Sequence, residues 1–262
     1  MSWRIVSVPV ESCTCLVTRS TAMMGSDMNE GVVLRAVSRS RARSRRLWLA
    51  HCSVLALAAS VGLPVAVAAA GSKQPHGPTI LVLGDSLSAE YGLARGSGWV
   101  ALLAARLAQR KIAATVINAS ISGDTTSGGL SRLPALLKQH RPDIVILELG
   151  GNDALRGLPL AMTRANLEAM ARDAKAAGAK VVIAGMELPP NYGRKYGDEF
   201  AALFAQVAKG EHAALVPFLL KGVADGPQAD TMFQADRIHP KAAAHPLILD
   251  NVWPVLEPLL RR

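Results

Sequence analysis

A serine follows one of the most apolar stretches of the chain. Residues 79–83, Thr-Ile-Leu-Val-Leu, run directly into Gly84-Asp85-Ser86. An apolar run of this length, bounded by glycine, predicts a buried strand. Because ligands bind beyond the carboxyl ends of the strands in an open parallel sheet, Ser86 lies where a nucleophile is expected. A serine after a strand is also a common helix cap, so its role depends on whether a base and an oxyanion hole accompany it.

The base could be His239, which stands in the segment Asp236-Arg237-Ile238-His239-Pro240. A carboxylate three residues before a histidine, in a turn that enters a helix, can bind the ring Nδ1–H. That arrangement leaves Nε2 free to accept a proton. A helix cap beside a surface histidine would show the same spacing, so the pattern alone is not decisive.

Two glycine-containing turns could supply oxyanion donors. Gly123 lies in Ser122-Gly123-Asp124, where the backbone N–H can approach a ligand closely, and Asn152 in Gly150-Gly151-Asn152-Asp153 carries a donating amide. The alternatives are an ordinary turn glycine for Gly123 and a helix N-cap or an Asx turn for Asn152. In a doubly wound sheet these turns share one rim with Ser86 and His239, which favours a single site over separate coincidences.

Alternating apolar runs and helical spacings predict the elements that position these residues. Strands are expected at 79–83, 113–117, 143–149, 179–184 and 213–217, and helices at 98–111, 125–139, 162–177, 197–210 and from 240. This alternation indicates an α/β protein, a parallel sheet with helices on both faces. Pro134 lies inside the second helix and predicts a kink or an earlier end there. Trp99 and Trp253 stand at helical spacing and are expected in the core.

The combined blocks resemble the GDSL or SGNH hydrolases, whose second name refers to Ser, Gly, Asn and His. The resemblance rests on Gly84-Asp85-Ser86-Leu87-Ser88, Gly123, Gly151-Asn152-Asp153 and Asp236-x-x-His239, and it covers about residues 79–258. Further blocks resemble the periplasmic thioesterase I, lysophospholipase and arylesterase branch; they are Asn118–Thr125, Arg132–Leu137, Glu148–Gly157 and Leu188–Gly193.

This resemblance implies a flavodoxin-like three-layer α/β/α sandwich with a five-stranded parallel sheet, the SGNH hydrolase fold. It also implies a Ser86–His239–Asp236 triad, with the Ser86 N–H, the Gly123 N–H and the Asn152 amide as oxyanion donors. The implied activity is a serine hydrolase that cleaves ester and thioester bonds of acyl substrates through an acyl-enzyme. Arg237 departs from the small residue usual in this branch, which leaves the leaving-group preference open.

The expected substrate is a small acyl ester or thioester, including lysophospholipids. Apolar loops at 154–160 and 187–193 would flank an acyl chain, so Leu155, Pro189, Tyr192 and Asp85 are candidate substrate contacts. The loops could instead serve packing. As possible metal ligands, Asp85 and Asp153 are less suitable than as structural hydrogen-bonding residues, because no His, Asp or Glu cluster has metal-ligand spacing. A carbohydrate O-deacetylase and a non-catalytic envelope binding module are the alternative functions.

The amino-terminal part indicates export. Residues 39–46 are Arg-rich, and residues 47–70 are apolar and end in small residues, as in a secretory signal. We expect residues 1–38 to be an unstructured extension, which a start at Met24 or Met28 would mostly remove, and 71–262 to be the hydrolase domain. A periplasmic or secreted protein without a stable membrane anchor follows, although an uncleaved anchor would show a similar apolar run.

Charge and cysteine content exclude several other classes. The net charge is +9, but residues 1–70 hold eight Arg against three acidic residues, so only +4 belongs to 71–262 and no nucleic-acid partner is expected. All three cysteines, Cys13, Cys15 and Cys52, precede residue 71, which excludes a disulfide or thiolate nucleophile from the mature part. We expect no cofactor and no metal, and a monomer.

Overall fold

The computed structural model describes residues 77–261. The predicted extension 1–38 and signal segment 39–70 lie outside the described residues, so their assignments stay predictions. No helix within the described range is long and apolar enough to cross a membrane.

The described residues form a parallel sheet of five strands in the order β2-β1-β3-β4-β5. This order is the flavodoxin-like one, and its topological switch point lies between β1 and β3. The bounds differ from the predicted ones by one or two residues; they are β1 Thr79–Gly84, β2 Thr115–Asn118, β3 Ile144–Glu148, β4 Lys180–Ala184 and β5 Ala214–Val216.

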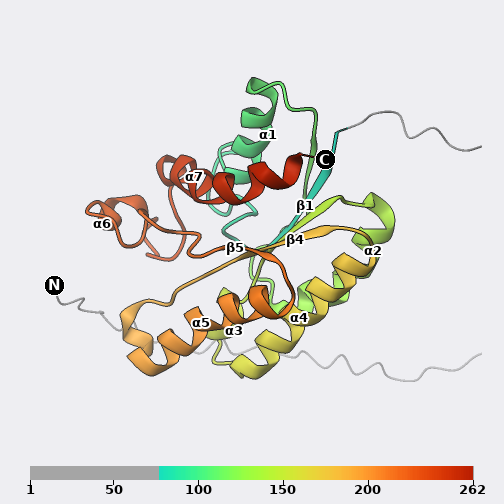
Figure 1. The fold of residues 1–262 in the computed structure, drawn as a ribbon. Coiled ribbons are helices and arrows are strands. Elements are labelled where there is room, and N and C mark those ends of the chain that lie inside the picture. Colours follow the sequence, from blue (N-terminus) through green and yellow to red (C-terminus); the bar gives the residue numbers. More distant parts are fainter. Residues whose placement is uncertain (1–76, 262) are drawn as a thin grey trace, which may run out of the picture. The chain divides into compact units, whose positions relative to one another are not determined.

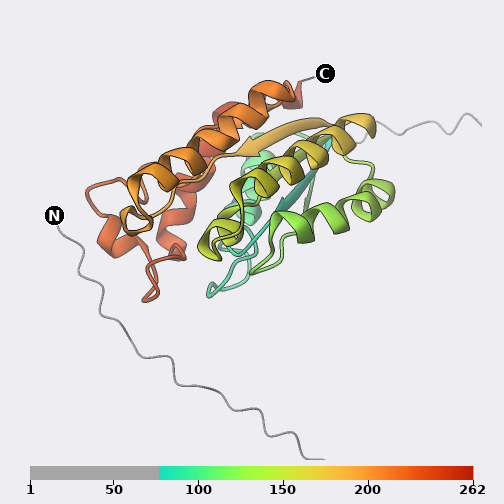
Figure 2. The ribbon, with the colours of Figure 1, turned by 90° about the horizontal axis from the view of Figure 1, so that it is seen from below.

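Helices cover both faces of the sheet, which confirms the three-layer α/β/α sandwich (Figure 1). One layer holds α1 (Trp99–Gln109) and α7 (His245–Leu256). The other layer holds α2 (Thr126–His140), α4 (Leu160–Ala176) and α5 (Arg194–Gly210), and Figure 2 shows these three helices side by side in front of the sheet.

The period of two along each strand explains why both faces are covered. In β1, Ile80 and Val82 pack toward α1 and α7, whereas Leu81 and Leu83 pack toward α2, α4 and α5. The predicted core position of Trp99 and Trp253 is confirmed, because they are 0% and 6% exposed.

Three local features differ from the predicted pattern. α2 does not end at Pro134 but continues to His140; Pro134 lies on the exposed side, where the helix carbonyl left without its N–H donor can be hydrated. The turn after β3 is a short helix, α3 (Gly151–Leu155), too brief to show a helical period. The final helix begins at His245, after a 3₁₀ turn over Ala242–Ala244, rather than at 240.

Smaller elements complete the described chain. They are the 3₁₀ turn Pro190–Tyr192 before α5, the helix α6 (Ala229–Met232), and the 3₁₀ turn Glu257–Leu260 after α7.

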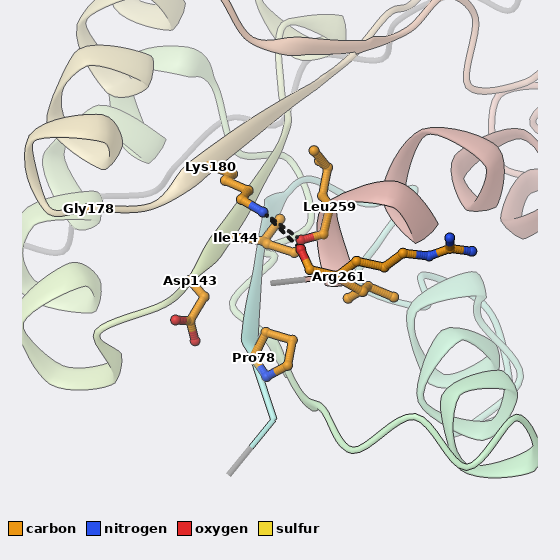
Figure 3. Close-up of a pocket in the computed structure, with 8 residues that line it drawn as sticks. Pro78, Asp143, Ile144, Gly178, Lys180, Leu259 and Arg261 are labelled. Carbon is orange, nitrogen blue, oxygen red and sulfur yellow. Dashed lines mark hydrogen bonds between the residues drawn. The ribbon is translucent and has the colours of Figure 1, made fainter. Parts of the chain in front are cut away.

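A small cavity lies at the amino ends of the strands, on the opposite side of the sheet from Ser86. Its lining includes Pro78, Asp143 and Lys180, which stand at the amino ends of β1, β3 and β4 (Figure 3). The Lys180 ammonium donates to the carbonyl oxygen of Leu259 at 2.9 Å, which ties the carboxyl-terminal turn to the sheet. Catalytic side chains follow the carboxyl ends of the strands, so this cavity is not part of the candidate active site.

Candidate active site

Ser86 begins the tight turn that follows β1. The carbonyl of Asp85 accepts hydrogen bonds from the N–H groups of Ser88 and Ala89 at 3.3 and 2.9 Å, which folds the chain back immediately after the strand. The Ile121 N–H donates to the Gly84 carbonyl at 3.0 Å, so the segment after β2 lies against the same strand end. The predicted nucleophile therefore stands at the carboxyl edge of the sheet.

The structure brings the three predicted triad residues together. The distance between His239 Nε2 and Ser86 Oγ is 2.9 Å, and the distance between His239 Nδ1 and Asp236 Oδ2 is 2.7 Å. These contacts join residues 153 positions apart in the chain. A serine bound to a histidine that a carboxylate orients in turn is the geometry of an activated nucleophile.

The loop that carries Asp236 and His239 is held by its own hydrogen bonds. Asp236 Oδ1 accepts the N–H groups of Ile238 and His239, both at 3.0 Å. Arg237, directly after Asp236, adopts a left-handed backbone with φ of 58°, a conformation that residues other than glycine rarely adopt. The turn therefore presents both the Asp236 carboxylate and the His239 ring on the side of Ser86.

The charge of Asp236 is stabilised in this turn. Partial burial alone would raise the pKa of its carboxyl, but the hydrogen bonds from the His239 ring and from the two N–H groups outweigh burial and lower the pKa below its usual value. Asp236 is therefore ionised at neutral pH and can orient the His239 ring.

The predicted oxyanion donors converge on the same edge. Within residues 77–261, neither the Ser86 N–H nor the Gly123 N–H donates to a protein acceptor. Gly123 has a φ of 79°, a conformation that other residues rarely adopt. Asn152, in α3, uses its amide nitrogen to donate to Asp85 Oδ2 at 3.0 Å, and its second hydrogen remains available to a substrate oxygen.

Asp85 does not face the open side of the site. It is 3% exposed, and its oxygens accept the Leu87 N–H at 3.0 Å and the Asn152 amide. Burial raises the pKa of its carboxyl to about 6, against the opposing effect of these hydrogen bonds. Asp85 is therefore a structural hydrogen-bond acceptor and not the expected substrate contact, because a carboxylate turned inward cannot reach a substrate.

The other candidate substrate contacts lie on two neighbouring segments. Leu155 ends α3, and Pro189 and Tyr192 border the 3₁₀ turn that leads into α5. The Tyr196 hydroxyl, from α5, donates to the Ala154 carbonyl at 3.5 Å, which joins the two segments. Their contact with an acyl chain stays a prediction.

Sequence reasoning missed four residues around the triad. Tyr91 lies against the ring of His239, with ring centroids 4.2 Å apart, although it is 48% exposed. Gln234 donates from Nε2 to the Tyr91 carbonyl at 2.9 Å and to the Pro240 carbonyl at 3.2 Å, which joins the loop after Ser86 to the loop of His239. Arg156 donates to the Gly123 carbonyl at 2.8 Å, and Glu148 lies buried behind Ser86.

Only Glu148 carried a usable signal in the sequence. It is an acidic residue inside the apolar run 143–149, and acidic side chains are rarely buried in a strand unless they are paired. Tyr91, Gln234 and Arg156 belong to irregular segments without periodicity, so the contacts that matter are made only by the folded chain.

The described residues offer no cluster of three or more His, Cys, Asp or Glu side chains that could hold a metal ion. Asp153, the remaining acidic residue of the Gly-Asn-Asp block, is buried and accepts hydrogen bonds from the Thr126 N–H at 2.9 Å and from the Thr126 hydroxyl at 2.5 Å. It therefore fixes the start of α2 against α3.

Comparison with proteins of known sequence gives close relatives. Esterase TesA of Pseudomonas aeruginosa is 53% identical over 189 residues, which cover 72% of this chain and 92% of the relative. Thioesterase 1/protease 1/lysophospholipase L1 of Escherichia coli is 44% identical over 182 residues, covering 70% and 85%. The arylesterase of Vibrio mimicus is 44% identical over 173 residues, covering 66% and 85%.

Solved structures and a family model agree with these relatives. The crystal structure of TesA is 54% identical with a TM-score of 0.67 and covers 69% of this chain and 99% of its own. The psychrotrophic esterase EstA from Pseudoalteromonas sp. is 39% identical with a TM-score of 0.66, covering 71% and 100%. The model of the GDSL-like lipase/acylhydrolase family matches residues 82–247. This chain belongs to that family.

Proposed function

We propose that Ser86, His239 and Asp236 form the catalytic triad of this ester hydrolase, and that it cleaves carboxylic ester and thioester bonds of acyl substrates. The observation that carries the proposal is the continuous chain of contacts from Asp236 Oδ2 through His239 to Ser86 Oγ, with distances of 2.7 and 2.9 Å. The N–H groups of Ser86 and Gly123 support it, because neither donates to an acceptor within residues 77–261. Such donors can stabilise the negative charge that develops in the transition state.

The proposed acylation step begins with proton transfer. His239 Nε2 accepts the Ser86 proton while Ser86 Oγ attacks the carbonyl carbon of the substrate. The resulting oxyanion receives hydrogen bonds from the Ser86 N–H, the Gly123 N–H and the second amide hydrogen of Asn152. The tetrahedral intermediate collapses, His239 returns its proton to the departing alcohol or thiol, and an acyl-Ser86 ester remains.

Deacylation repeats the sequence with water. His239 removes a proton from a water molecule, the hydroxide attacks the acyl carbonyl, and the same three donors hold the second oxyanion. Collapse of that intermediate returns the proton to Ser86 Oγ and releases the carboxylic acid. Asp236 stays ionised throughout and stabilises the imidazolium that forms in each step.

The proposed substrates are medium or long acyl esters, thioesters and lysophospholipids. Three apolar candidate contacts support an acyl site. Leu155 ends α3, and Pro189 and Tyr192 border the 3₁₀ turn before α5, which the hydrogen bond of Tyr196 joins to α3. The relatives, which include a thioesterase/lysophospholipase and an arylesterase, support the same class. In a series of p-nitrophenyl esters we expect octanoyl to be hydrolysed faster than acetyl; the reverse order would favour the O-deacetylase alternative.

We also propose that the protein is exported to the periplasm or secreted. The support is the sequence of residues 39–70, with its Arg-rich start and apolar stretch. Amino-terminal sequencing of the protein recovered from a bacterial periplasmic fraction is expected to begin near residue 71, whereas a protein that retains 47–70 and stays with the membrane fraction would contradict cleavage.

The decisive experiment is covalent labelling of Ser86. A fluorophosphonate probe should label the wild-type protein and not Ser86→Ala, and the same variant should lose p-nitrophenyl ester hydrolysis by roughly 10⁴-fold or more. Ser131→Ala, an exposed serine on α2, is the matched control and should keep both properties. Turnover retained in Ser86→Ala would refute the assignment, and a wild-type protein that neither labels nor hydrolyses would favour the binding module.

A further inference from the structure

The mechanism leaves one buried acidic residue unused. Glu148 is the last residue of β3 and is 0% exposed. In the sheet it pairs with Gly84, the last residue of β1, two positions before Ser86. A Cβ atom at position 84 would lie 2.5 Å from Glu148 Oε2, so glycine at this position makes room for the Glu148 carboxyl directly behind the nucleophile turn.

Glu148 Oε2 contacts both flanks of Ser86. It accepts the Asp85 N–H at 3.3 Å and the Ser88 hydroxyl at 2.5 Å. The Trp99 indole N–H donates to Ser88 Oγ at 3.1 Å, so the hydrogen of the Ser88 hydroxyl is directed toward Glu148. One oxygen atom thus holds the residue before Ser86 and the residue two positions after it.

The surroundings of Glu148 favour an uncharged carboxylic acid. No salt bridge in the described part of the chain involves it, and its Oε1 has no hydrogen-bond partner there. A buried carboxylate without a cation is costly, and Asp85 is a second buried carboxyl beside it. Burial, and then the neighbouring Asp85, raise the pKa of Glu148 well above its usual range, while the bonds from Ser88 and the Asp85 N–H oppose this shift.

We propose that Glu148 is a positioning residue which, as a neutral acid, holds the Ser86 turn from behind through the Asp85 N–H and the Ser88 hydroxyl. Because Oε2 accepts both bonds, the acid proton belongs on Oε1. Glu148 also acts on the proposed oxyanion hole, because it binds the Asp85 N–H and the Asp85 carboxylate in turn orients the Asn152 amide. This inference rests on the proposed role of Ser86 as the nucleophile.

Variants at position 148 separate the neutral form from the charged one. Glu148→Ala removes the acceptor for both flanks, and we expect kcat to fall by about 10- to 100-fold while KM changes by less than about threefold. Glu148→Gln keeps a neutral acceptor of the same length and should restore kcat to at least about fivefold above the alanine variant. Glu168→Gln, a partly exposed residue of α4, is the control for loss of an acidic group.

Thermal melting across pH gives a second readout. The folded state holds the Glu148 proton more tightly than the unfolded chain, so wild-type stability falls as pH rises above the usual glutamate value of about 4.3. Asp85 is the titratable group that acts on Glu148, and its carboxyl is present in both proteins. The melting temperature of Glu148→Gln should therefore increase relative to wild type as pH rises. A difference in melting temperature that stays constant across pH would overturn the proposal that Glu148 is a neutral acid.

Labelling rates distinguish failure of this inference from failure of the proposed function. If the wild-type protein and a folded Glu148→Ala variant react with the fluorophosphonate at the same rate, the role of Glu148 is overturned and Ser86 remains the nucleophile. A folded Glu148→Gln variant no faster than alanine would overturn it as well. If Glu148→Ala does not fold, Ser88→Ala removes one of the two bonds and should slow labelling by about threefold or more; an unchanged rate there contradicts the proposal.

Discussion

The two halves of the proposed triad, Ser86 on one side and Asp236 with His239 on the other, are built in different ways. Ser86 follows a central strand and has buried carboxyl groups behind it, because Asp85 and Glu148 are 3% and 0% exposed. The proposed base lies on an irregular loop between α6 and α7, where the Asp236 and His239 side chains are 37% and 17% exposed. The sheet positions Ser86, whereas a short turn and a few hydrogen bonds position His239.

The pKa values of the carboxyl groups are also shifted in opposite directions on the two sides of the site. On the nucleophile side, burial raises the pKa of Asp85 to about 6. On the base side, hydrogen bonds outweigh partial burial and lower the pKa of Asp236. The carboxylate proposed to orient the base thus lies near solvent, where a negative charge is little desolvated, whereas the buried acids serve as hydrogen-bonded structural groups.

The largest expected effect tests whether the two halves act as one unit. His239→Ala should lower kcat for p-nitrophenyl esters by roughly 10⁴-fold or more, and adding Ser86→Ala should reduce the rate little further. His140→Ala, at the end of α2, is the matched control. Losses that multiply in the double variant, measured by steady-state kinetics, would show that the halves contribute independently.

A smaller loss is expected when one donor on the nucleophile side is removed. Asn152→Ala deletes an oxyanion donor and should reduce kcat by about 10²- to 10³-fold with the fold retained. Asn166→Ala provides the comparison, because its amide donates to Thr126 Oγ1 at 3.0 Å and not to the site. If both variants hydrolyse esters at the wild-type rate, Asn152 does not stabilise the oxyanion.

The bridge between the halves should have a moderate effect. Gln234→Ala removes the hydrogen bonds to the Tyr91 and Pro240 carbonyls, and we expect kcat to fall by about tenfold, in line with bonds worth about 1 kcal/mol each. Gln109→Ala, on the exposed end of α1, should leave kcat unchanged. A base loop positioned by its internal bonds alone would instead leave Gln234→Ala fully active.

The smallest effect is a contrast in stability across pH. Because the folded pKa of Asp85 is raised, wild type should lose stability relative to Asp85→Asn as pH rises from about 4 to about 6. Because the folded pKa of Asp236 is lowered, the stability it contributes is present above about pH 4 and is lost as pH falls further. The difference in melting temperature from wild type should change with pH in opposite directions for Asp85→Asn and Asp236→Asn. Changes in the same direction would contradict the contrast.

Much of the fold could be predicted because it depends on local patterns. The apolar runs located all five strands of the described sheet within a few residues, and glycine-bounded strand ends located Ser86, Gly123 and Asn152 on one edge. The short helix α3 and the unbroken α2 were not predicted, since a five-residue helix shows no period and the effect of Pro134 depends on which side of the helix faces water.

The sequence by itself determined which residue types were available for acyl transfer and on which strand ends they stand, because strand periodicity and turn chemistry are local properties of the chain. The tertiary structure alone decided the contacts between distant segments. It placed His239 against Ser86 across 153 positions, laid Tyr91 on the His239 ring, and turned Asp85 and Glu148 inward. Burial and through-space distance, which set hydrogen bonds and pKa values, exist only once the layers have packed.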